Sequence, residues 1–264
     1  MKKLALVLGG GATKGYAHIG VLKVLEEHGI KPDLVVGTSM GAIVGAMYCA
    51  GKDCEQLTKM SIKLTKRKIM DFNPFNAFFS TGILSGKKLR NVLQTELGDT
   101  THKQLQIPFI ATATNLLTGK LEILKQGNVV NNIMASSAIP GVYPIVEKDD
   151  INLCDGGLLD NVPDDIARKF GKNYIVMSID VIGDYNKQVE SSKIKIMGIT
   201  INALTLMQAQ ITKLKCNNSD LFIKITQPDV AQMSFNKESI EKSIDYGATE
   251  MKKNITKLKN LLKD

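Results

Sequence analysis

Gly37-Thr38-Ser39-Met40-Gly41 is the stretch that decides how the first half of this chain is expected to fold. An apolar run at 34–36 precedes it and predicts a buried strand, and the run at 42–50 predicts a packed helix. A G-x-S-x-G between a strand and a helix is the nucleophile-elbow pattern, in which small residues allow a sharp turn that exposes the serine hydroxyl. The start of the next helix would offer unpaired N–H groups to an oxyanion there. Ser39 is therefore a candidate nucleophile.

A second glycine turn lies nearer the start of the chain. The apolar run 4–8 predicts a strand, Gly9-Gly10-Gly11-Ala12-Thr13-Lys14-Gly15 follows it, and a helical pattern then runs to Gly29. Two successive strand–turn–helix units predict a parallel sheet whose loops meet at one end. We therefore expect the amides of Gly10, Gly11 and Ala12 to face Ser39 as an oxyanion hole.

Nucleotide binding is a competing interpretation of this glycine turn, and it fails on spacing. A dinucleotide fold requires G-x-G-x-x-G and an acidic residue near the end of the second strand, whereas this chain has G-x-G-x-x-x-G and carries Gly37 and Ser39 there. A phosphate-binding P-loop requires Gly-Lys-Ser/Thr, but Lys14 precedes Gly15.

A serine nucleophile needs a base within hydrogen-bonding reach. The histidines are His18, His28 and His102, and since none follows residue 102, the α/β-hydrolase order with a late histidine is excluded. We expect all three to be structural or solvated. Asp155 is the best candidate base, because it ends a β-like run and two glycines after it permit close approach. The alternative is that Asp-Gly-Gly is only a hairpin turn.

Taken together, these motifs resemble those of the patatin-like phospholipases, in particular the small single-domain bacterial members. The stretches at 9–20, 37–41 and 155–157 occur in the family's order and rough spacing. Further agreement lies in four stretches, at 82–86, 107–115, 135–141 and 160–163. The similarity extends from about residue 3 to 182.

This resemblance implies a three-layer α/β/α fold with a mainly parallel central sheet, and a Ser–Asp dyad that hydrolyses acyl esters of lipids. Ser39 would be the nucleophile, Asp155 the base, and the amides of Gly10, Gly11 and Ala12 the oxyanion hole. Ala12 stands where the family usually has a third glycine, which would cost about 1 kcal/mol or more if φ is positive there. Other residues are expected to support the site, namely Gly9, Lys14, Gly15, Gly37, Gly41, Gly156 and Gly157, with Asn161 and Pro163 holding the loop that positions Asp155.

Length and composition predict one domain over residues 1–264, with the catalytic core at about 3–182 and a more variable helix–strand–helix part after it. The four cysteines show no metal-ligand spacing, so we expect neither a metal nor an organic cofactor. Apolar runs are too short for a signal peptide or a membrane span, which predicts a cytoplasmic protein, peripheral to the membrane at most. Outside the motifs we expect a hairpin at 109–124, helices at 163–170, 191–215 and 252–263, and strands at 174–181 and 221–226.

The formal net charge of +8 is concentrated in residues 52–90, which hold nine Lys or Arg against three Asp or Glu. The same segment contains four of the eight phenylalanines, Phe72, Phe75, Phe78 and Phe79. One interpretation is a lid, over about 66–86, that lies on an anionic membrane. The other is that the phenylalanines fill the core while the lysines are solvated. Nucleic-acid binding is not expected, because no known binding module is visible.

The sequence thus predicts a serine lipid acyl hydrolase, a phospholipase, lysophospholipase or carboxylester hydrolase that works through an acyl-enzyme. Two alternatives stay open, an acyl-thioesterase or acyltransferase, and a regulatory adaptor with little turnover.

Overall fold

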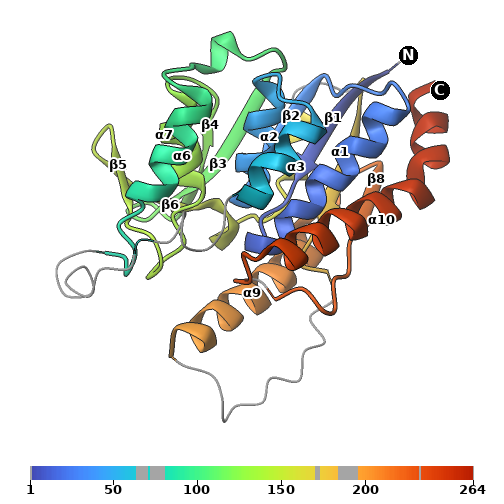
Figure 1. Cartoon of the computed structure of the whole chain (residues 1–264). Helices are drawn as coiled ribbons and strands as arrows, with labels where there is room; N and C mark the ends of the chain where they lie inside the picture. Colours follow the sequence, from blue (N-terminus) through green and yellow to red (C-terminus); the bar gives the residue numbers. More distant parts are fainter. Residues whose placement is uncertain are drawn as a thin grey trace.

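A computed structural model describes residues 2–63, 71, 81–169, 173–183, 196–231 and 233–263 (Figure 1). The expected lid at 66–86 and its phenylalanines lie largely outside these residues. An eight-stranded sheet with the order β5-β6-β3-β2-β1-β7-β8 organises the chain, and β4 pairs with β3 beside this path. The strands are β1 (Lys3–Leu8), β2 (Leu34–Gly37), β3 (Phe109–Asn115), β4 (Lys120–Leu124), β5 (Val146–Lys148), β6 (Ile151–Asp155), β7 (Tyr174–Asp180) and β8 (Leu221–Lys224).

The central strands are parallel, as the two glycine-turn units predict. The pairs β1–β2, β2–β3, β1–β7 and β7–β8 are parallel, whereas β4, β5 and β6 add antiparallel pairs at one side. Because parallel strands end at the same edge, the loops after β1 and β2 meet there.

Helices cover both faces of the sheet and complete the three layers. Leu4, Leu6 and Leu8 of β1 belong to the larger core, whereas Ala5 and Val7 point to the smaller core on the opposite face. The helices are α1 (Ala17–Glu27), α2 (Met40–Cys49), α3 (Cys54–Lys63), α6 (Lys87–Leu97), α7 (Val129–Ser136), α8 (Asp164–Lys169), α9 (Ile196–Lys215) and α10 (Lys237–Lys263), with the 3-10 helices η1 (Ala12–Tyr16), η2 (His102–Gln104) and η3 (Gly156–Leu158).

The secondary structure expected from the sequence is confirmed in the described residues, with ends shifted by a few positions. β3 and β4 form the hairpin, β7 and β8 are the two later strands, and α8 and α9 lie in the predicted helical segments. The terminal helix is longer than the sequence predicts, because α10 begins at Lys237 and not near residue 252. Its earlier turns bury Ile240, Ile244 and Gly247 at helical spacing, which continues the same apolar stripe.

Candidate active site

Ser39 lies between β2 and α2 in a strained backbone conformation. Its φ of 55° and ψ of −122° lie outside the regions that ordinary residues favour, and the side chain is buried. Its amide donates to Ser136 Oγ at 3.0 Å, which ties the turn to α7. Only glycine fits at the flanking position 41, because a Cβ there would lie 2.0 Å from the carbonyl oxygen of Leu8. The sharp turn between strand and helix that the sequence predicts is therefore present, with Ser39 at its corner.

The glycine turn after β1 lies beside Ser39, as predicted. A Cβ on Gly10 would lie 3.0 Å from Ser39 Cβ, so a side chain at this position would crowd Ser39. Ala12 has a φ of 49°, in the left-handed region that is costly for alanine because of its Cβ. The loop thus keeps the shape of a glycine turn although residue 12 is an alanine.

One of the three predicted oxyanion donors already has a partner. The Gly10 amide donates to the Asn161 carbonyl at 3.2 Å, whereas in the described part of the chain no acceptor is found for the amides of Gly11 and Ala12. Gly11 and Ala12 both line the pocket that contains Ser39. They are therefore the amides available to an oxyanion.

Asp155 is the last residue of β6 and is almost completely buried. The expected hairpin alternative is wrong, because β6 runs into the 3-10 helix η3 and not into a turn to a paired strand. Asp155 Oδ1 accepts from the Gly157 amide at 2.8 Å. Burial raises the pKa of Asp155 to about 6, against the lowering effect of hydrogen bonds from the Ser39 hydroxyl and the Gly157 amide. A carboxylate with this pKa is a better base than an ordinary aspartate.

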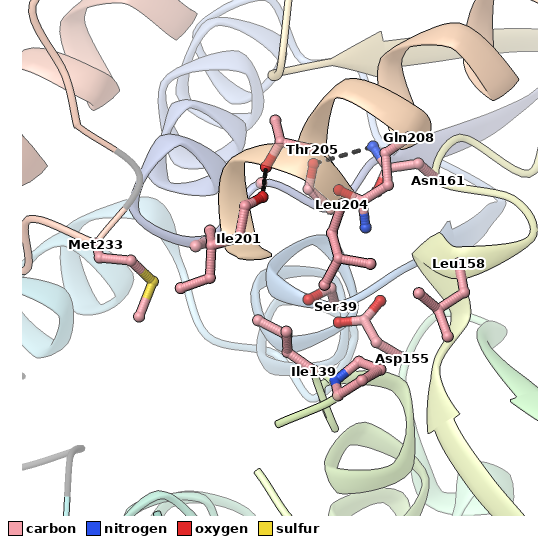
Figure 2. Close-up of a pocket in the computed structure, with 14 residues that line it drawn as sticks. Ser39, Ile139, Asp155, Leu158, Asn161, Ile201, Leu204, Thr205, Gln208 and Met233 are labelled. Atoms are coloured by element: carbon pink, nitrogen blue, oxygen red, sulfur yellow. Dashed lines mark hydrogen bonds between the residues drawn. The ribbon is translucent and has the colours of Figure 1, made fainter. Parts of the chain in front are cut away.

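Ser39 and Asp155 share a pocket of about 480 Å³, a volume that includes space open to solvent (Figure 2). Its polar floor is made by the glycine loop, the two candidate catalytic residues and Asn161. In Figure 2, Ile201 and Leu204 of α9 lie across the pocket from Ile139, with Ser39 and Asp155 between them. The apolar walls suit an acyl chain, whereas the polar atoms gather around Ser39.

The wall residues are what sequence reasoning missed. They are Ile139, Pro140, Leu158, Ile201, Leu204, Thr205, Gln208 and Met233. Ile139 and Pro140 lie inside a stretch that carried the resemblance but received no role. The α9 residues follow helical spacing, which predicts an inward face, but spacing alone cannot say which feature that face covers.

Lys14 is not brought into the pocket. Its Nζ donates to the carbonyl of Ile182 at 3.5 Å, and its own carbonyl accepts from Gln227 Nε2 and Ser243 Oγ. These contacts tie the glycine loop to the C-terminal part of the chain. Asn161 holds the same loop, since its Nδ2 donates to the Gly10 carbonyl at 3.2 Å. Asn161 also lines the pocket, and Pro163 lies just before α8. That these two residues hold the loop that positions Asp155 stays a prediction.

Two of the histidines, His18 and His102, are buried, whereas His28 is exposed, with its Nδ1 2.8 Å from the Val24 carbonyl oxygen. His18 is fully buried with Nε2 2.7 Å from the Gly9 carbonyl oxygen, and burial lowers its pKa to about 4. A neutral His18 therefore donates to Gly9 and braces the glycine loop from behind. His102 Nδ1 lies 2.9 Å from the Phe109 carbonyl oxygen, and Asn132 Nδ2 lies 2.9 Å from its Nε2. Among the described residues, no cluster of three His, Cys, Asp or Glu could hold a metal ion.

Comparison with known proteins places these residues in a family. The family model described as patatin-like phospholipase matches residues 6–168. An uncharacterized NTE family protein of Mycobacterium bovis is 39% identical over 162 residues, which cover 61% of this chain and 44% of that protein. Human patatin-like phospholipase domain-containing protein 6 is 32% identical over 182 residues, covering 67% of this chain and 13% of the human protein.

Two further similarities complete the comparison. A lysophospholipase of Scheffersomyces stipitis is 31% identical over 180 residues, or 67% of this chain and 12% of that protein. The crystal structure of VipD from Legionella pneumophila aligns over 95% of this chain and 67% of that chain, with a TM-score of 0.48 and 14% identity. This chain therefore spans less than half the length of the curated relatives described. With the matched region containing Ser39, Asp155 and the glycine loop, the chain belongs to the patatin-like phospholipase family.

Proposed function

We propose that this protein hydrolyses acyl esters of lipids through an acyl-enzyme on Ser39. The observation that carries the proposal is the shared pocket, in which a buried serine and a buried carboxylate of raised pKa lie beside the free amides of Gly11 and Ala12. In the first step Ser39 Oγ attacks the ester carbonyl carbon while its proton passes to Asp155. The amides then stabilise the oxyanion, a contribution worth about 3–4 kcal/mol per donor in enzymes of this kind.

The second half of the reaction frees the enzyme. The leaving alcohol takes the proton from Asp155, and water then attacks the acyl-Ser39 carbonyl with Asp155 as base. Fatty acid and free Ser39 result. Because one named relative is a lysophospholipase, lysophospholipids are the first substrates to examine.

The test is labelling with a serine-reactive fluorophosphonate, read by intact mass. We expect one adduct on the wild type and none on Ser39→Ala, with circular dichroism spectra that coincide. A panel of nitrophenyl esters, lysophospholipids and acyl-thioesters then separates ester hydrolysis from thioesterase activity, and an added alcohol reveals acyl transfer. A well-folded wild type with no adduct, also in the presence of anionic vesicles, would contradict the proposal and favour an adaptor.

Contact with an anionic membrane through residues 52–90 is a second part of the proposal. Several basic residues in the described part of this segment already have partners, as Lys52 pairs with Glu96 at 2.7 Å and Lys59 pairs with Glu55. No helix among the described residues has the length and apolar content needed to cross a bilayer. Co-sedimentation with vesicles of phosphatidylcholine, with and without phosphatidylserine, tests the contact. Binding that does not depend on phosphatidylserine would contradict it.

A further inference from the structure

The outer face of α9 carries a stripe of exposed apolar side chains. Eight large apolar residues are exposed in the described part of the chain, and four of them belong to this helix. They are Ile199, Leu206, Met207 and Leu214, with exposed fractions of 56%, 43%, 58% and 76%. Separations of seven or eight residues amount to about two helical turns, so these side chains lie on one side of α9. Single exposed apolar residues are normal on a protein surface, but a set gathered on one face indicates an interaction surface.

The opposite side of the same helix forms a wall of the Ser39 pocket. The residues of α9 that line the pocket are Ile201, Leu204, Thr205 and Gln208. At about 100° per residue, these positions point away from the exposed stripe. α9 also packs against η3, which directly follows Asp155. The thickness of one helix therefore separates the pocket from whatever covers the stripe, and in Figure 1 α9 lies at the lower edge of the molecule.

The charges on α9 favour an anionic partner. The helix contains neither Asp nor Glu, and its charged residues, Lys213 and Lys215, are in the last turn. Lys213 is exposed, and Lys215 Nζ donates to the Leu159 carbonyl at 3.1 Å. A helix with an apolar face, no acidic residue and lysines at one end suits the surface of a lipid layer. There the apolar side chains enter the boundary of the acyl chains while the lysines meet anionic headgroups.

A second copy of this chain is a less suitable occupant of the stripe. Stable complexes bury about 800 Å² on each partner, and the centres of their interfaces are rich in aromatic residues. The stripe offers four large apolar side chains, and α9 contains no aromatic residue. An interfacial helix needs less, because its apolar face enters the lipid layer by only about 5–10 Å.

We propose that the outer face of α9 docks the protein on a lipid layer that contains anionic lipids. The choice of a lipid layer as the occupant rests on the proposed function, because the pocket behind α9 would take its substrates from such a layer. α9 would lie along the lipid surface with the Ser39 pocket on its other side. A helix with its side chains is about 10–12 Å across, so docking holds the pocket at that distance from the headgroups. This surface is separate from residues 52–90.

Co-sedimentation with vesicles of phosphatidylcholine and phosphatidylserine tests the docking without depending on catalysis. The double variant Met207→Gln/Leu214→Gln makes the two most exposed positions of the stripe polar. We expect its binding to the vesicles to be weaker by about 10- to 100-fold, because apolar side chains no longer leave water. The matched control is Leu116→Gln/Leu117→Gln in the β3–β4 hairpin, at exposed fractions of 48% and 66%, which should bind like the wild type. Neither pair lines the pocket, so both variants should hydrolyse a short, soluble nitrophenyl ester at the wild-type rate.

A second measurement uses the absence of tryptophan from the chain. Leu206→Trp places a single tryptophan on the stripe, and brominated phosphatidylcholine quenches a tryptophan that reaches the acyl chains. We expect the fluorescence of Leu206→Trp to be quenched on the vesicles and that of Leu117→Trp to be unchanged.

Three results of the co-sedimentation would overturn the proposal: a wild type that does not bind, binding that survives the stripe variant, and equal losses in the two double variants. Sedimentation velocity gives a fourth, since a dimer that the stripe variant converts to a monomer would show that a second copy covers α9. Labelling with the fluorophosphonate keeps the proposed function apart from these outcomes. Vesicle binding that follows the stripe without an adduct on Ser39 would leave the docking in place and remove the hydrolase, whereas an adduct without binding would do the reverse.

Discussion

Two strained residues meet at the candidate site, and both were visible in the sequence. Four non-glycine residues among those described have a positive φ, and Ala12 and Ser39 are two of them. The other two, Asp149 and Asp150, form the turn between β5 and β6. Strain of this kind persists where surrounding contacts enforce it, and it is frequent at active sites. Glycines on both sides of each residue indicate a sharp turn, and this is why the sequence alone was enough to locate both turns.

Replacing Ala12 with glycine should stabilise the protein. At a φ of 49°, alanine pays a steric penalty that glycine does not, although glycine loses more backbone entropy on folding. We expect the free energy of unfolding to rise by about 0.5–1 kcal/mol, measured by urea denaturation. Thr13→Gly is the control, since Thr13 has no positive φ and the change should destabilise. A loss of stability in Ala12→Gly would show that the strain is absent.

The raised pKa of Asp155 predicts the pH dependence of the reaction. Asp155 acts as a base only when ionised, and burial holds its pKa at about 6. We expect the logarithm of kcat/KM to rise with pH and to level off above about pH 6. A profile measured from pH 4.5 to 8 with a nitrophenyl ester tests this. An acid limb near pH 4 would mean that the carboxylate is not desolvated.

Asp155→Asn should abolish turnover and yet stabilise the fold. Between pH 3.8 and 6 the folded state retains a proton that the unfolded chain has released, so the stability of the wild type falls as pH rises through this window. The variant carries no such cost. We expect it to exceed the wild type by about 1–3 kcal/mol at pH 7 and by little below pH 4. Thermal unfolding of both proteins from pH 4 to pH 7 measures the difference in stability. A difference that does not change with pH would show that the raised pKa of Asp155 is not its cause.

At the scale of elements, α1 and α10 cross at two glycines. A Cβ on Gly20 would lie 1.9 Å from the carbonyl oxygen of Ile244, and one on Gly247 would lie 1.9 Å from that of Ala17. In Figure 1, α10 lies across α1 near the end of the chain. The helix backbones therefore approach more closely than any side chain allows. The sequence did not single out Gly20 for this contact, because a glycine within a helical pattern does not show that it will pack against Ile244, 224 residues later.

Gly247→Ala should force these two helices apart. Because the obstructing atom is a backbone oxygen, no side-chain rotation relieves the clash. We expect the free energy of unfolding to fall by about 1–3 kcal/mol, the usual cost of overpacking. Thr249→Ala on the exposed side of α10 is the control and should change stability by less than about 0.5 kcal/mol. Equal effects of the two substitutions would mean that the crossing is looser than described.

For the molecule as a whole, the motifs and the walls of the site come from different parts of the chain. The matched family region, residues 6–168, supplies Ser39, Asp155 and the glycine loop. The later part supplies Gln208 and the apolar wall of α9, the edge strand β8, and α10 packed on α1. Motif residues were predictable because turns and chemistry constrain them locally. The wall was not, because many apolar sequences satisfy the same packing, and only the folded chain shows which helix covers the site.

A chain ending at residue 236 should therefore lose its cooperative fold, although it retains every motif residue. Removing α10 exposes the face of α1 and deletes six buried apolar side chains, those of Ile240, Ile244, Met251, Ile255, Leu258 and Leu262. Burial of such side chains contributes about 1.5–3 kcal/mol each, so the loss rivals the 5–15 kcal/mol that stabilises a typical domain. We expect calorimetry to show no unfolding transition for this chain, while Lys259→Ala in the full chain melts like the wild type. A cooperative transition close to that of the full chain would mean that the motif region folds independently, and α10 would then be an appendage instead of part of the core.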